Sequence, residues 1–97
     1  MSLAIVSDDG TVTVTDAAVM QIVAQAAERI DGVRVRRRQS AVAIAGGGAH
    51  VQVELAVAFG RVLPDVARAV QEQVASSLGT MCGVDVRAVD VTVEELD

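Results

Sequence analysis

The sequence has no tryptophan, tyrosine, asparagine or lysine, and it has one phenylalanine (Phe59), one cysteine (Cys82) and one histidine (His50). Without lysine there is no phosphate-loop lysine and no Schiff base. One cysteine and one histidine do not make the usual zinc site, and a single cysteine forms no intrachain disulfide. We therefore expect no metal, no cofactor and no enzyme activity.

Acidic residues outnumber basic ones, which gives a formal net charge of −5 over 97 residues. This charge, together with the lack of stacking aromatic side chains, argues against nucleic-acid binding. The apolar runs are far shorter than the roughly 20 residues of a membrane-spanning helix, and the N-terminus lacks the pattern of a signal peptide. A single thiol is typical of a reducing compartment. We expect one cytoplasmic domain over residues 1–97, without direct membrane insertion. Residues 3–6 are either a partner strand that closes a hairpin or part of a loose N-terminal segment over residues 1–9, and we favour the loose segment.

Hydrophobic periodicity predicts the first two elements. Polar and apolar residues alternate over 11–15, which is typical of a strand. Apolar residues at helical spacing over 19–30 predict a helix that Thr15 or Asp16 caps at its start. Gly32 stands where a left-handed residue would end this helix.

Three strands are predicted next, over residues 33–36, 41–45 and 50–59, with the glycines of 46–48 in a hairpin turn. The longest of them has one apolar face, which we expect in the core: Val51, Val53, Leu55, Val57 and Phe59. Its other face is polar or small: His50, Gln52, Glu54, Ala56 and Ala58.

A second amphipathic helix is predicted from Pro64 to Gly79, and a last strand over residues 84–94. The valines of that strand change from even to odd positions, so a β-bulge near residues 87–88 would return them to one face. The predicted order is β-α-β-β-β-α-β. We expect an α+β fold with both amphipathic helices on one face of a mainly antiparallel sheet.

Two features are candidates for an interaction surface. Half of the cations lie within five residues: Arg34, Arg36, Arg37 and Arg38. They form either an anion-binding site or a solvated segment that discourages strand pairing. Alanines on outward-facing positions form a second, smooth patch suited to another subunit: Ala41, Ala43, Ala45, Ala56 and Ala58.

His50 and Cys82 have weaker chemical interpretations. His50 begins a strand without a second metal ligand or a neighbouring nucleophile, so it predicts neither a metal site nor a catalytic base. Cys82 follows the predicted second helix, where the dipole disfavours a thiolate, and we interpret it as a small buried apolar residue.

Several short segments occur in an order and spacing that resemble a known bacterial family. They are Gly10–Thr15, Ile30–Val33, Val57–Gly60, the Val70–Gln71 step, Met81–Val84 and Val89–Val93. Together they resemble the alkaline shock protein twenty-three family, also called general stress or envelope stress response proteins. Phe59 and Cys82 stand where tyrosine and threonine are commoner.

The resemblance implies a non-enzymatic cytoplasmic protein of Gram-positive type bacteria with a role in cell-envelope homeostasis. It implies a scaffold that self-assembles or is recruited to the membrane by a separate small anchor protein. Two alternatives stay open: an RNA-binding module of the KH type and a small-ligand regulatory domain. The first would need a Gly-x-x-Gly loop, and the segment from Gly79 to Gly83 has a different spacing.

Overall fold

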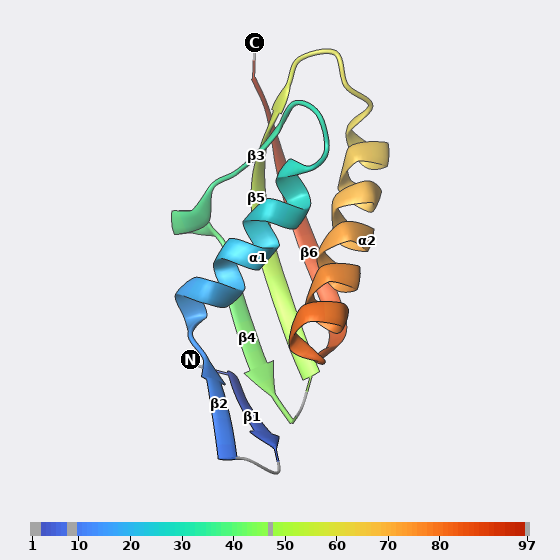
Figure 1. Cartoon of the computed structure of the whole chain (residues 1–97). Coiled ribbons are helices and arrows are strands. Elements are labelled where there is room, and N and C mark those ends of the chain that lie inside the picture. Colours follow the sequence, from blue (N-terminus) through green and yellow to red (C-terminus); the bar gives the residue numbers. More distant parts are fainter. Residues whose placement is uncertain (1–2, 8–9, 47, 97) are drawn as a thin grey trace.

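The computed structural model describes residues 3–7, 10–46 and 48–96. The elements follow one another as β1 (Leu3–Ser7), β2 (Gly10–Val14), α1 (Asp16–Glu28), β3 (Val33–Val35), the short 3₁₀ helix η1 (Arg37–Gln39), β4 (Ala41–Ala45), β5 (Gly48–Ala58), α2 (Leu63–Cys82) and β6 (Asp85–Leu96). Both α-helices lie on the same side of the long sheet (Figure 1). The predicted α+β arrangement is confirmed.

β5 is the central strand of the four-stranded sheet. Along one edge it pairs antiparallel with β4 near its start and with β3 near its end. Along the other edge it pairs with β6 over its whole length, and this pairing is parallel. The parallel pair follows from the connection through α2, because a helix carries the chain back to the end of the sheet where β5 began.

The N-terminal part differs from the expectation in two ways. Residues 3–7 form strand β1, which pairs antiparallel with β2, whereas a loose segment was expected there. The other residues of that segment, 1, 2, 8 and 9, lie outside the described residues. β2 pairs with β1 in a separate two-stranded sheet and not with the main sheet. β1 and β2 pair along their whole length, from Leu3 opposite Val14 to Ser7 opposite Gly10, so each strand supplies hydrogen-bond partners to the other.

The core lies between the helices and the covered face of the sheet. Val51, Val53, Leu55 and Val57 of β5 are fully buried, as predicted. They pack with valines and alanines of α1 and with Val66, Val70, Val74 and Leu78 of α2. Phe59 was predicted to share this face and does not. It is 71% exposed, because β5 ends at Ala58 and the chain then turns at Gly60 towards α2.

The helix starts follow the sequence pattern more closely than the helix ends. The Thr15 hydroxyl caps α1 by accepting a hydrogen bond from the Ala18 N–H at 3.2 Å. α1 ends at Glu28, so Gly32 lies in the turn before β3 and is not its cap. α2 continues through Gly79 to Cys82, and Gly83, with a φ of 64°, is the residue that ends it.

The predicted bulge in the last strand is confirmed. Ala49 of β5 faces Val86, and the next residue, His50, faces Ala88, so Arg87 is the extra residue. Beyond it Asp90, Thr92 and Glu94 are exposed. Val89, Val91 and Val93 pack against the core.

Cys82 lies in the last turn of α2, where it is buried, and burial raises the pKa of its thiol. The thiolate is the reactive form, so the folded protein should react slowly with a thiol-modifying reagent at neutral pH and rapidly in urea. Equal rates would contradict this placement.

The folding free energy that the neutral thiol of Cys82 contributes is present below the ordinary thiol pKa and is lost as pH rises through the pKa of the folded protein. Cys82→Ala should lack this alkaline loss in denaturant titrations.

Candidate functional site

No helix of the described residues lies over one side of the main sheet, and we call this side the open face (Figure 1). The pairing registers place its side chains in rows across the strands. From the β4 end towards the β3 end, the residues of β5 are His50, Gln52, Glu54, Ala56 and Ala58. The facing residues of β6 are Ala88, Asp90, Thr92, Glu94 and Leu96. The open face is therefore polar at its centre and apolar at two of its corners.

The first corner consists of alanines on β4. Ala41, Ala43 and Ala45 share one side of the strand and are all exposed, as predicted. Ala43 faces His50, whose Nε2 atom lies 2.7 Å from Oδ2 of Asp90 on β6. The His50–Asp90 pair and the alanines together form a mostly small-residue surface, which we call the alanine corner.

Ala56 does not belong to an exposed patch, although the sequence predicted it there. It is only 6% exposed. Its neighbours across the sheet are Arg34 on β3 and Glu94 on β6. An ion pair of 3.0 Å joins Glu94 to Arg36, so long side chains extend over β5 from both sides. The methyl group of Ala56 lies between these side chains and is covered. Ala58 is therefore not continuous with the exposed alanines of the alanine corner.

The four clustered arginines have different surroundings. Arg34 is exposed on the open face, and Arg36 is half-buried in the ion pair with Glu94. The Nε atom of Arg36 is buried without a hydrogen-bond partner. Arg37 and Arg38 are exposed on η1, which projects beside the sheet between β3 and β4. The segment therefore presents its charge in several directions.

Ser40 holds η1 in place, a role that the sequence pattern did not indicate. Its hydroxyl donates to the backbone carbonyl of Arg36 at 2.8 Å and accepts from the Glu54 N–H at 3.0 Å. Both partners are backbone groups, and one of them lies on β5. The turn that bears Arg37 and Arg38 is thereby fixed to the central strand.

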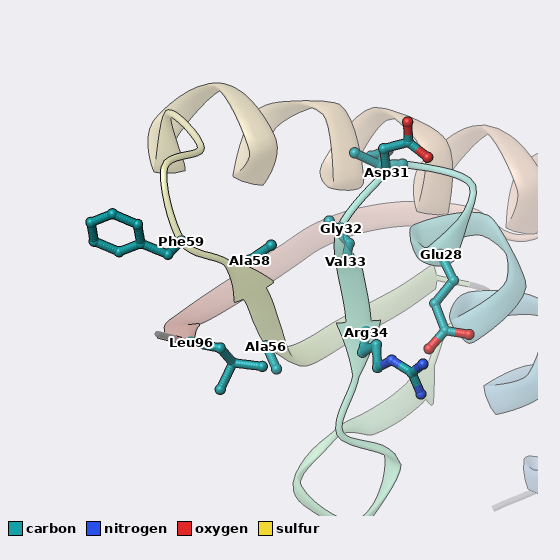
Figure 2. A pocket seen from close by; sticks show the side chains of 10 residues that line it. Glu28, Asp31, Gly32, Val33, Arg34, Ala56, Ala58, Phe59 and Leu96 are labelled. Atoms are coloured by element: carbon teal, nitrogen blue, oxygen red, sulfur yellow. The ribbon is translucent and has the colours of Figure 1, made fainter.

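The second apolar corner lies at the opposite end of the open face. A cleft of about 670 Å³ is lined there by Ala58, Phe59, Leu96 and Arg34, among others. Figure 2 shows Phe59 projecting outward beyond the end of β5 and Leu96 beside Ala56. Phe59 and Leu96 are both exposed large apolar residues, and no sequence pattern predicts either at the surface. Their exposure depends on where β5 and β6 end.

The described residues hold no assembled candidate metal site. They contain no group of three or more His, Cys, Asp or Glu side chains that could hold a metal ion. Gly79 lies inside α2 and Gly83 caps it, so this segment is not a loop between two helices. The described part of the chain also has no helix of the length and apolarity needed to cross a membrane.

The sequence profile of one protein family matches residues 35–97, which cover β4, β5, α2 and β6. The chain belongs to the alkaline shock protein twenty-three family. This family is described as having a cell envelope-related function. The match confirms the family suggested by the sequence motifs, and the matched part contains the whole alanine corner.

Solved structures with a similar fold include several variants of the MamM C-terminal domain. One histidine-to-alanine variant is 20% identical with a TM-score of 0.60, and the alignment covers 84% of this chain and 98% of that chain. A cadmium form of another variant is 23% identical with a TM-score of 0.59, and the coverage is 84% and 96%. At this identity the likeness establishes the fold alone. No curated protein sequence matches the chain.

Proposed function

We propose that this family member is a non-enzymatic assembly module that works in cell-envelope homeostasis by associating with copies of itself through the open face. The family supplies the cell envelope-related function. The alanine corner supports the assembly role, because three exposed alanines on a flat strand allow another surface to approach closely.

The alanine corner is the centre of the proposed contact, and the cleft beside Phe59 and Leu96 adds a second apolar contact. Arg34, Arg37 and Arg38 form charged flanks of this contact. In the cell we propose a cytoplasmic protein that a separate small anchor protein holds at the membrane. The anchor protein is the partner that the resemblance to the alkaline shock protein twenty-three family implies.

A charge at the alanine corner should prevent assembly. In the variant Ala43→Glu a charged carboxylate would be placed at the proposed contact, where it would lose its water when another copy of the chain docks. We expect the self-association constant to fall at least about tenfold, which corresponds to about 1.4 kcal/mol of binding free energy. Sedimentation equilibrium at several protein concentrations measures it.

Ala17→Glu is the matched control. Ala17 is exposed in the first turn of α1, on the helix side of the sheet, where a carboxylate suits the helix dipole. This variant should associate like the parent protein. If the two variants associate equally, the contact does not lie at the alanine corner. Ala58→Glu tests the second corner in the same way, whereas Ala56 is too buried for this use.

A further inference from the structure

The outer edge of β6, which faces away from β5, has no strand partner among the described residues. At this edge Nε2 of Gln71, from α2, donates a hydrogen bond to the backbone carbonyl of Val89 at 3.0 Å. Along a strand, the backbone N–H and C=O groups of every second residue point to the same side. Those of Val91, Val93 and Glu95 therefore point away from β5, as those of Val89 do. Such an edge is a template for a further strand.

A groove accompanies this edge. It has a volume of about 280 Å³ and lies between α2 and the first half of β6, lined by Gln71, Glu72, Ala75 and residues 86–89. A strand added to β6 would point alternate side chains into this groove and onto the open face. In this recognition mode main-chain hydrogen bonds provide affinity and the groove provides specificity.

The charge beside the edge is mainly acidic. Asp90 and Glu94 are exposed on the open face of β6, and Glu72 is exposed at the groove. Within the described chain, Glu72 and Glu95 have no ion-pair partner, whereas Asp90 lies against His50 and Glu94 is paired with Arg36. Arg87 is a cation that lines the groove. It lies near Asp85 and close to the carbonyl of Gly46. This charge is complementary to a basic segment and repels a second β6 strand, which carries the same carboxylates.

We propose that the outer edge of β6 binds an extended basic segment of a partner protein as an added strand. Its apolar side chains lie in the groove over Ala75 and Val89, and its arginine or lysine side chains lie beside Asp90 and Glu94. Gln71 competes with the segment, because its amide gives Val89 the hydrogen bond that the added strand would give. The proposed site shares Asp90 with the alanine corner, whereas Gln71 and Glu72 belong to the edge and groove alone, so variants of these two residues test the proposal separately from self-assembly.

Calorimetric titration of the whole chain with a capped hexapeptide, Arg-Val-Arg-Val-Arg-Val, tests the proposal. The protein should bind this peptide and should not bind the matched Glu-Val hexapeptide. Gln71→Ala removes the competing hydrogen bond and should tighten binding about 2- to 10-fold. Val91→Pro removes one outward N–H group and should abolish binding, provided that its thermal unfolding shows a folded protein.

A pair of surface variants keeps the test decisive if Val91→Pro does not fold. Glu72→Arg reverses a charge at the groove and should weaken binding. Asp31→Arg makes the same change in the turn before β3, at the other edge of the sheet, and should leave affinity unchanged. If Glu72→Arg and Asp31→Arg weaken peptide binding equally and Gln71→Ala has no effect, the peptide is held by general charge attraction and the proposal is overturned. The proposal would also be overturned by a Gln71→Ala protein that binds no peptide and has a higher mass than the parent protein at the same concentration, because the edge then takes a second copy.

Discussion

Replacing Leu55 with alanine is expected to lower the free energy of unfolding by about 2–5 kcal/mol. Leu55 is fully buried at the middle of the sheet, where it faces Val35 of β3 and Val93 of β6. Removing three carbon atoms there loses apolar contacts with neighbouring strands and with the helices above, and the paired strands restrict collapse into the cavity. A small domain has a total stability of only about 5–15 kcal/mol, so the loss is a large share of it.

Urea unfolding monitored by circular dichroism measures this loss. Leu96→Ala is the matched control, because Leu96 ends β6 and is an exposed apolar residue. Its effect on the free energy of unfolding should stay within about 0.5 kcal/mol. Similar losses in the two variants would show that Leu55 does not occupy the centre of the core.

The second large effect concerns the end of α2, where two glycines four residues apart should respond oppositely. Gly83 has a φ of 64°, a region that disfavours side chains branched at Cβ, so Gly83→Val should cost about 1–3 kcal/mol. Gly79 lies within the helix, and an added Cβ would meet the carbonyl oxygen of Val84 at an ordinary 3.9 Å. Gly79→Ala should therefore gain about 0.5–1 kcal/mol.

Thermal unfolding of the two variants and of Gly83→Asn measures these effects. Asparagine tolerates the left-handed conformation better than valine, so Gly83→Asn should recover much of the loss. A helix that ended at Gly79 would give the reverse order, with Gly79→Ala destabilising and Gly83→Val nearly neutral.

Much of the fold could be predicted because local sequence patterns determine its helices and strands. The change of phase between Val86 and Val89 predicts a bulge near residues 87–88, since a continuous strand would divide its valines between two faces, and the register identifies Arg87 as the extra residue. The end of α2 could not be located in the same way. Gly79 and Gly83 both suit a helix end, and only the path of the chain into β6 decides between them.

The candidate surface depended more on contacts between distant segments. The three alanines of β4 share a face by strand alternation alone, which the sequence shows directly. The burial of Ala56 depends on Arg36 reaching Glu94 across β5, and the register of both neighbouring strands decides this. The hydrogen bond from Gln71 to Val89 likewise joins a helix to a strand edge, and no local pattern indicates it.

The central claim is that this member of the alkaline shock protein twenty-three family works by assembly through its open face. Light scattering after size exclusion, over a wide range of protein concentrations and at low and moderate salt, tests it most directly. We expect the mass to rise above that of one 10.0 kDa chain as concentration increases. Involvement of the arginine flanks would make the rise sensitive to salt. A mass of one chain at every concentration and both salt levels would contradict the account.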